Sequence, residues 1–294
     1  MNQCGKVLNK MEYANGILLI NKEQDLTSRD VVNKISKKLN IKKVGHAGTL
    51  DPLATGLLVI GVGKGTKILD LLTLDTKEYV ATVKMGFQTD TLDITGNIIN
   101  KNDNLKIKKE ELEKCLNSFL GSYYQTVPKY SAVKINGKKL YEYARSEIDI
   151  ELPKRLVDIK EIELLNYNEE TLEFTFRTLV SKGTYIRSLI DDIGKSLNIF
   201  CTMKNLVRTK SGKFSLEDSF TIEENYSFIQ IKDALDYKKI VIDDEILLKK
   251  VMNGNILELP FEKDEFLLFL NSDNQELAIY VRDENKSYKA FKVF

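Results

Sequence analysis

Short apolar and alternating segments, separated by helical ones, dominate the pattern of hydrophobic positions along the chain. Residues 16–21 form an apolar run that is typical of a buried strand. Residues 77–86 alternate between apolar and polar positions, which predicts a strand buried on one face. Four side chains then share that face: Tyr79, Ala81, Val83 and Met85. Residues 156–166 and 172–180 alternate in the same way and predict a hairpin.

Two helices are indicated by apolar positions that recur every three or four residues. Thr27 and Ser28 supply an N-cap before the first, and its stripe is Val31, Val32, Ile35 and Leu39. The second is predicted over residues 184–197. Weaker patterns predict helices over residues 66–74, 110–120, 140–145 and 243–252, and strands over residues 57–62, 130–135, 206–214, 266–270, 277–281 and 288–294.

Strands outnumber helices and follow one another mostly as hairpins, so we expect an α+β fold with a mixed, largely antiparallel sheet and flanking helices. The charge pattern divides the 294 residues into two units. Residues 1–214 carry 34 Lys and Arg against 26 Asp and Glu, a net charge of +8. Residues 215–294 carry 10 against 17, a net charge of −7, and predict a small acidic α/β or β-barrel-like domain.

The rare residues exclude several kinds of site. The chain has one histidine, His46, and three cysteines that are far apart in sequence, without a CxxC pair. A disulfide framework and a zinc site are therefore not expected. A Ser-His-Asp triad would have to use His46. We expect a site without a metal, whose chemistry relies on carboxylates, tyrosine, lysine or arginine.

No signal for a membrane is visible in the sequence. The apolar runs fall well short of the roughly 20 residues that a membrane-spanning helix needs. The first fifteen residues contain Lys6, Lys10 and Glu12 and lack the apolar region of a signal peptide. The sequence therefore predicts a soluble, cytoplasmic protein with no membrane partner.

Three basic runs contain few or no acids: residues 34–50, 125–145 and 201–214. The last of them carries Lys204, Arg208, Lys210 and Lys213. Each run alone is explained equally well by a solvated, lysine-rich surface. Together, beside glycines and tyrosines, they favour a groove that binds a polyanion.

A glycine-rich loop over residues 45–56 places Asp51 between glycines and Pro52. Glycine allows a backbone to approach a ligand closely, and proline stiffens the turn after the acid. By itself an Asp-Pro pair in a loop is more often a simple turn. Residues 61–66 resemble part of a phosphate-binding loop. We reject that interpretation because Val62 stands where the motif requires lysine.

The run GHAGTLDPLATGLLVIGVGKGTK, which begins at Gly45, resembles the signature of the TruB-type tRNA pseudouridine synthases. Further segments similar to that family follow in its order, so that the resemblance covers most of residues 15–214. They are residues 21–28, 77–96, 125–145, 181–189 and 206–212. The resemblance implies that residues 1–214 form the catalytic domain; it thins after them, and we expect residues 215–294 to be a small α/β or PUA-like appendage.

The resemblance also implies a reaction: isomerisation of uridine 55 in the T-loop of tRNA to pseudouridine, with no metal or organic cofactor. By position, Asp51 matches the catalytic carboxylate, Tyr79 an active-site tyrosine that stacks on the base, and Arg187 the arginine that pairs with the carboxylate. The implied partner is the T-arm of tRNA. We expect the chain to act as a monomer that requires no protein partner.

Four further positions match substrate contacts of the family. Tyr185 and Leu206 match positions in the substrate pocket, although without the resemblance both are better explained as core. Lys22 is expected to contact a phosphate near that pocket. His46 matches a histidine that contacts flipped nucleotides, which implies a wedge that fills the gap left by an extruded base.

Two alternatives use the same residues differently. A tRNA-binding folding chaperone could carry isomerase activity incidentally, although a pure binder does not need a carboxylate facing phosphates. A catalytic subunit guided by a separate RNA is a third interpretation, which the acidic C-terminal unit disfavours. An assay of the isolated chain on unmodified tRNA separates the third from the first.

Overall fold

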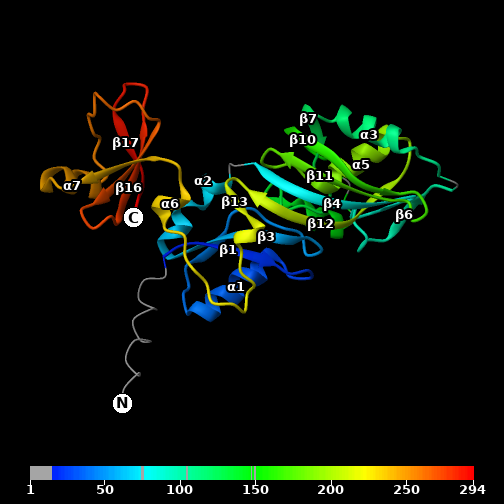
Figure 1. Cartoon of the computed structure of the whole chain (residues 1–294), viewed down its shortest axis with the longest axis horizontal. Helices are drawn as coiled ribbons and strands as arrows, with labels where there is room; N and C mark the ends of the chain where they lie inside the picture. Colours follow the sequence, from blue (N-terminus) through cyan, green and yellow to red (C-terminus); the bar gives the residue numbers. More distant parts are fainter. Residues whose placement is uncertain (1–14, 74–75, 104, 147, 149) are drawn as a thin grey trace, which may run out of the picture.

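The computed structural model describes residues 15–73, 76–103, 105–146, 148 and 150–294. The first fourteen residues, on which much of the argument against a signal peptide depends, lie outside the described residues. Figure 1 shows a large sheet with its helices and, at one end of the molecule, a smaller sheet built from the C-terminal residues. Within the described residues, no helix has the length and apolar character needed to cross a membrane.

The large sheet has nine strands, and its main path runs β1-β3-β12-β4-β11-β10-β7 (Figure 1). Every pairing is antiparallel except that of β12 with β3, which confirms the predicted mixed, largely antiparallel sheet. The strands on the path are β1 (Gly16–Lys22), β3 (Thr55–Val62), β4 (Lys77–Met85), β7 (Gly121–Thr126), β10 (Lys154–Asn168), β11 (Glu173–Val180) and β12 (Cys201–Ser211). Off the path, β2 (Val44–His46) pairs with β3 and β13 (Phe214–Ser215) pairs with β12.

Helices cover the sheet where the sequence predicts them. α1 (Ser28–Leu39) begins at the N-cap Thr27, whose side chain accepts a hydrogen bond from the backbone N–H of Asp30. α3 (Lys109–Ser118) packs on β10, and α5 (Ile186–Ser196) packs on β12 and β4. The predicted helical stripe of α5 is buried, since Leu189, Ile190 and Ile193 have no exposed surface.

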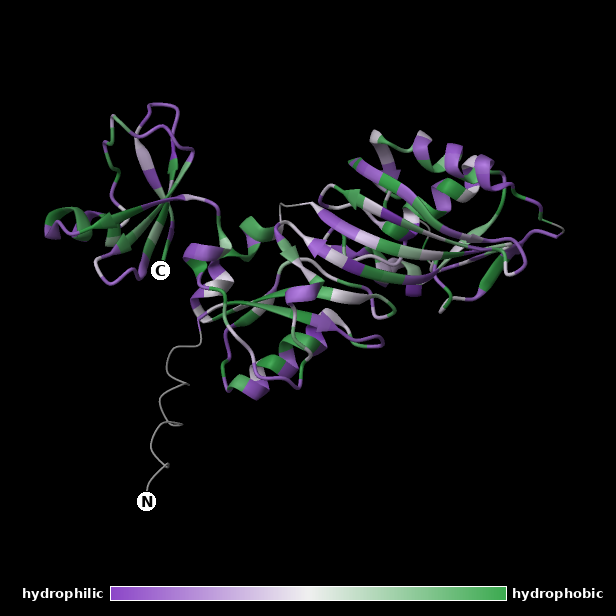
Figure 2. Ribbon diagram, viewed as in Figure 1, coloured by the Kyte–Doolittle hydropathy of each residue, from purple (hydrophilic) through white to green (hydrophobic). Residues whose placement is uncertain are grey.

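The core forms on both faces of β1 and β3. Leu18 and Ile20 belong to a cluster that includes side chains of α1, α3 and α5, whereas Ile17 and Leu19 face a second cluster. This arrangement explains the continuous apolar run in β1, because a strand buried on both faces has no polar side. Figure 2 shows the contrasting alternation of hydrophilic and hydrophobic residues along β4, β11 and β12.

The predicted strand over residues 130–135 is wrong for most of its length. Only β8 (Lys134–Ile135) is a strand, and it pairs with β9 (Lys138–Lys139) around the expected Asn-Gly turn. The preceding carbonyls have other partners: the backbone N–H groups of Leu140 and Tyr141 donate to Val133 and Ser131. These bonds tie the segment to the start of α4 (Leu140–Arg145) instead of to a sheet.

Smaller elements complete the larger unit. β5 (Phe87–Thr89) and β6 (Ile98–Lys101) form a two-stranded sheet. A 3₁₀ helix over Gly63–Ile68 continues into α2 (Leu69–Thr73) in the region where the sequence suggests, and then excludes, a phosphate loop. A second 3₁₀ helix, Leu216–Asp218, follows β13.

The C-terminal unit is a four-stranded sheet of order β14-β15-β16-β17, in which only β14 and β15 are parallel. Its elements are β14 (Lys238–Ile242), α7 (Glu245–Met252), β15 (Phe266–Asn271), β16 (Glu276–Arg282) and β17 (Tyr288–Val293). Between the two sheets, Phe220 and Ile229 pair with β1, and α6 (Ile231–Ala234) packs beside them. A domain boundary at residue 214 stays a prediction.

Candidate active site

Five of the residues that the sequence singles out line one cavity of about 440 Å³. They come from distant parts of the chain: Asp51 from the loop between β2 and β3, Tyr79 from β4, Leu206 from β12, and Tyr185 and Arg187 from the start of α5. The fold thus brings together side chains that are up to 155 positions apart, from Asp51 to Leu206. The other two, His46 and Lys22, are not among the lining residues.

The loop that carries Asp51 is held on both sides of the carboxylate. On one side, the backbone N–H of Leu50 donates to Ser28 Oγ at 2.8 Å, and Ser28 is buried at the start of α1. On the other side, the carbonyl of Pro52 accepts from the N–H of Asp25 at 2.9 Å. A turn with the N–H of Ala54 donating to the Asp51 carbonyl completes the loop. Asp51 is therefore presented from a backbone with little freedom to move.

Lys22 supports this loop from inside the protein. Its side chain has no exposed surface, and Nζ donates to the carbonyls of Glu23, Leu26 and Pro52 at 2.9, 2.6 and 3.2 Å. An ammonium has three hydrogens, so these acceptors use all of them. Burial lowers the pKa of Lys22 to about 8, although Asp51 and Asp25 raise it. In this structure Lys22 has no surface with which to make the phosphate contact that the sequence predicts.

Arg187 holds the Asp51 carboxylate through one oxygen. Nε of Arg187 donates to Asp51 Oδ2 at 2.8 Å, and the arginine side chain is only 5% exposed while that of Asp51 is 37% exposed. Within the described part of the chain, Oδ2 is the carboxylate oxygen with a hydrogen-bond donor. The second oxygen, Oδ1, is left for whatever enters the cavity that Asp51 lines.

The remaining nitrogens of Arg187 are held by the backbone. Nη1 donates to the carbonyl of Thr91 at 2.8 Å and Nη2 to the carbonyl of Tyr130 at 2.9 Å. Three acceptors from three separate segments therefore surround one planar guanidinium. Because these acceptors fix the plane of the group, they also fix the direction from which Nε approaches Asp51.

Strand register explains why Tyr79 and Leu206 belong to the cavity. β4 and β12 are antiparallel neighbours, with Tyr79 opposite Arg208 and Ala81 opposite Leu206. Both Tyr79 and Leu206 are buried, with 8% and 5% of their surface exposed. They form an aromatic and an aliphatic wall beside the carboxylate, which suits a flat, uncharged ring.

Arg208 is a lining residue that sequence reasoning placed elsewhere, among expected phosphate contacts. It is 1% exposed; Nε donates to the carbonyl of Leu57 at 2.7 Å and Nη2 to that of Gly48 at 3.2 Å. Its period-two spacing from Leu206 was the available signal, since alternate residues of a strand share a face. Arg208 therefore ties β3 and the glycine-rich loop together from below the surface.

The other basic side chains of residues 201–214 are exposed, and each pairs with an acid from elsewhere in the chain. Lys204 donates to Glu173 at 2.7 Å, Lys210 lies 3.4 Å from Glu78, and Lys213 lies 2.6 Å from Asp236. The sequence does not indicate these pairs, because the acids lie on other strands or in the C-terminal half of the chain. Exposed pairs of this kind are weak, so the phosphate contacts expected of this run stay a prediction.

His46 lies on β2, opposite Ile60, five residues before Asp51. Its Nδ1 is buried without a hydrogen-bond partner among the described residues. Burial lowers the pKa of His46, and Arg29 and Arg208 lower it further, so the folded protein disfavours the charged ring. A partly exposed ring is compatible with a wedge, but His46 is not among the residues that line the cavity.

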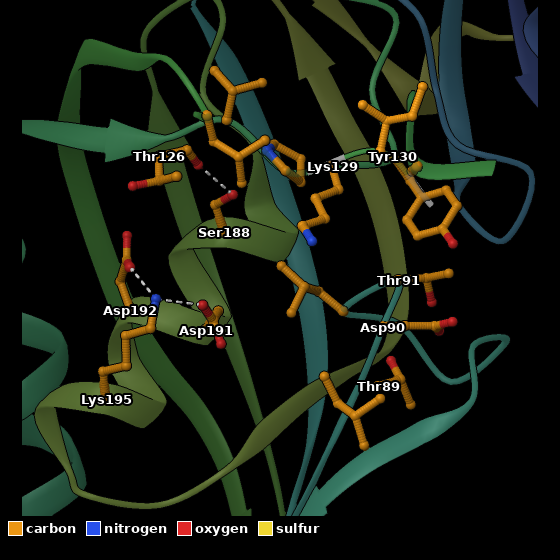
Figure 3. Close-up of a pocket in the computed structure, with 17 residues that line it drawn as sticks. Thr89, Asp90, Thr91, Thr126, Lys129, Tyr130, Ser188, Asp191, Asp192 and Lys195 are labelled. Atoms are coloured by element: carbon orange, nitrogen blue, oxygen red, sulfur yellow. Dashed lines mark hydrogen bonds and ion pairs between the residues drawn. The ribbon is translucent and has the colours of Figure 1, made fainter. Parts of the chain in front are cut away.

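A second cavity of about 520 Å³ lies beside the first and shares Tyr130 with it. Its lining includes Thr91 and Tyr130, whose carbonyls accept hydrogen bonds from Arg187, and Ser188, which follows Arg187 in the chain. Figure 3 shows the side chains of Asp191, Asp192 and Lys195 gathered at one end, where Lys195 lies 2.6 Å from Asp191. The sequence offered no signal for this cavity.

Comparison with known proteins identifies the family. A model of the TruB family pseudouridylate synthase N-terminal domain matches residues 36–186. A tRNA pseudouridine synthase B of Bacillus subtilis is 45% identical over 265 residues, covering 85% of this chain and 86% of that protein. A protein of the same name from Mesoplasma florum is 41% identical, covering 93% of this chain and 96% of the relative.

Solved structures agree in fold. A chain in an H/ACA ribonucleoprotein bound to a substrate RNA containing 2′-deoxyuridine superimposes with a TM-score of 0.70 at 23% identity, covering 95% of this chain and 84% of that one. A chain in a Cbf5-Nop10-Gar1 complex superimposes with a TM-score of 0.68, also at 23% identity and with the same coverage. At this identity the likeness shows the fold alone. The sequence relatives and the family model decide the identity: this chain belongs to the TruB family of pseudouridylate synthases.

Proposed function

We propose that this protein converts uridine 55 in the T-loop of tRNA to pseudouridine, with Asp51 as the catalytic carboxylate. Family membership makes the chain a pseudouridylate synthase, and the names of its relatives identify tRNA as the substrate class. One observation carries the assignment of Asp51. Its carboxylate lines a cavity with an aromatic wall and is held there by Arg187 through Oδ2.

The reaction needs a group of this kind. The bond between N1 of uracil and C1′ of the ribose breaks, the base turns, and C5 bonds to C1′; the proton lost from C5 balances the one gained at N1. A carboxylate can begin this either by attacking C1′ or by taking a proton from the ribose. Both routes require an oxygen that is directed at the sugar and is not already bonded to the protein.

The other wall residues fit the base rather than the sugar. We assign Tyr79 to stacking on the uracil ring while the ring turns, with Leu206 on the neighbouring strand as a second apolar contact. Tyr185 adds a second aromatic side chain to the lining. A stacked loop nucleotide must leave its neighbours to enter such a cavity, so the proposal includes base flipping.

The test removes the carboxylate, in Asp51→Asn without changing the size of the side chain. Asp51→Asn and Asp51→Ala should abolish tritium release from tRNA transcript labelled at C5 of uridine, while the dissociation constant of the tRNA changes by less than about threefold, because phosphate contacts dominate binding. Asp273→Asn, in an exposed turn between β15 and β16, is the matched control and should release tritium at the wild-type rate.

Two results would contradict the proposal. Release by Asp51→Asn above about a tenth of the wild-type rate would remove Asp51 from the chemistry. A tenfold loss of rate corresponds to an increase of only about 1.4 kcal/mol in the activation free energy. A transcript with cytidine at position 55 should release no tritium. Release from that transcript would show that another uridine is the target.

A further inference from the structure

Gln125 is a buried polar residue for which neither the cavity nor the fold has yet provided a reason. It is the penultimate residue of β7 and is 1% exposed. Its side-chain Oε1 accepts from the backbone N–H of Tyr185 at 2.8 Å, and its Nε2 donates to Tyr123 Oη at 2.8 Å. A buried amide is retained only where its donors and acceptors are used, and here both ends are occupied.

The order of donors gives the amide one orientation. The N–H of Tyr185 can only donate, so the oxygen of Gln125 must face it and the nitrogen must face Tyr123. Tyr123 Oη then donates to Asp192 Oδ2 at 3.4 Å. Burial raises the pKa of Tyr123, which keeps its hydroxyl hydrogen in place as the donor, and burial also raises the pKa of Asp192.

The hydrogen bonds through Gln125 and Tyr123 reach α5 at two places, Tyr185 and Asp192. Tyr185 is the N-cap of the helix and makes no side-chain cap of its own, so its N–H relies on Gln125. Asp192 lies nearly two turns further along the same helix. A second contact joins β7 to α5: Ser188 Oγ donates to the carbonyl of Thr126, the residue after Gln125, at 2.8 Å (Figure 3). The acceptors on Gln125 and Thr126 therefore flank the turn that carries Arg187.

We propose that Gln125 is a positioning residue that sets the first turn of α5 so that Arg187 meets Asp51. This inference rests on the proposed role of Asp51. Arg187 must reach three acceptors at once, on Asp51, Thr91 and Tyr130. A helix start displaced by about 1 Å would break this fit, and misplacements of that size can slow a reaction about a hundredfold.

The experiment compares two glutamines that both bond to α5. Gln125→Leu removes the acceptor at the first turn. Gln88→Leu is the matched control, because Gln88 Nε2 donates at 2.5 Å to Asp191, which lies beyond the turn that carries Arg187. Gln125→Glu keeps an oxygen for the N–H of Tyr185 and serves as the conservative rescue. Single-turnover tritium release, tRNA binding and the melting temperature are measured for the three full-length variants.

We expect Gln125→Leu to slow single-turnover release by about thirtyfold or more, with tRNA binding changed by less than about threefold. Gln88→Leu should stay within about twofold of wild type, and Gln125→Glu should recover most of the lost rate. If the two leucine variants lose rate in proportion to their melting temperatures, Gln125 is merely structural. A Gln125→Glu protein as slow as Gln125→Leu at equal stability would equally overturn the proposal.

A spectroscopic readout separates this inference from the assignment of Asp51. The Nε–H resonance of Arg187, observed by NMR of protein labelled with ¹⁵N-arginine, reports its bond to Asp51 without any turnover. Gln125→Leu should shift or broaden that resonance, and Gln88→Leu should not. An unmoved Nε–H in Gln125→Leu would sink the positioning role even if Asp51 were confirmed, whereas an active Asp51→Asn would sink only the catalytic assignment.

Discussion

The two sheets of this protein differ most in what they bury. Among the described residues, fourteen of the fifteen buried polar or charged side chains belong to the larger unit, up to residue 214, and the exception is Ser287. The larger unit buries Lys22, Arg187 and Arg208, each bonded to backbone carbonyls. The smaller sheet encloses apolar and aromatic side chains such as Phe269 and Tyr280.

This contrast indicates that the buried charges of the molecule, rather than its exposed ones, are associated with the candidate active site. Burying an unpaired charge costs several kcal/mol, so a fold keeps such groups only where neighbours compensate and an advantage follows. The lysines of the smaller sheet are instead on the surface in ion pairs, as with Lys238 and Glu262 or Lys289 and Asp283. Exposed pairs of this kind contribute little to stability. Four experiments test this contrast.

The largest effect is expected for stability when a buried cation is removed. Arg208→Met should lower the free energy of unfolding by about 3 kcal/mol, because it leaves the carbonyls of Leu57 and Gly48 without donors. Lys204→Met removes an exposed lysine from the same strand and should cost less than about 1 kcal/mol. Urea unfolding measures both. Equal losses would show that burial of the arginine is not what matters.

Arg187→Lys should reduce kcat about a hundredfold or more, equivalent to about 2.7 kcal/mol, because lysine keeps the charge but cannot meet three acceptors in one plane. Arg177→Lys is the matched control, since Arg177 binds Glu78, Glu161 and Glu163 on the solvent side of the sheet. Its kcat should stay within about twofold of wild type. If Arg187→Lys weakens tRNA binding and leaves kcat intact, Arg187 is an RNA contact.

Lys22 should make stability depend on pH in a predictable direction. An unfolded lysine titrates near 10.5, whereas burial lowers the pKa of Lys22 in the folded protein to about 8. The folded state therefore loses its proton first, and the penalty for burying the charge is relieved as the pH rises from 8 to 10.5. Relative to Lys22→Met, the wild type should gain about 2 kcal/mol between about pH 7 and about pH 9.5.

The measurement is the free energy of unfolding of both proteins across that range, with Lys38→Met as the control. Lys38 lies on α1 and its Nζ donates to the carbonyls of Ile222 and Glu224 on the surface. A difference between wild type and Lys22→Met that stays flat with pH would mean that Lys22 titrates as it does in the unfolded chain.

The smallest effect is expected for tRNA affinity, when exposed lysines are replaced in either of the two units. Lys42 and Lys43 are exposed next to β2, and no ion pair involves them in the described part of the chain. Replacing both with glutamine should weaken binding up to about tenfold and flatten the log–log salt dependence by about 1.5, if each contacts a phosphate. Lys289→Gln with Lys292→Gln is the control, because Asp283 and Asp70 already pair with these lysines. The reverse ranking would place the RNA on the smaller sheet.

Local pattern was sufficient for most elements and for the loop that carries the chemistry. The alternation in β4, the N-cap of α1 and the apolar stripe of α5 are properties of neighbouring residues, so they can be read along the chain. The segment before β8 was misjudged because its backbone carbonyls are used by α4 and Arg187 rather than by a strand. The resemblance placed Asp51, Tyr79 and Arg187 by position, and the fold brings all three to one cavity.

The fold class, the family and most of the side chains around Asp51 follow from the sequence. Which cations are available to a ligand depends on the tertiary structure. Lys22, Arg208 and Lys204 look alike as basic residues in sequence, yet one is buried under the loop, one ties β3 to that loop, and one pairs with Glu173. The physical reason is that burial and pairing depend on neighbours contributed by distant segments, so no local pattern contains them.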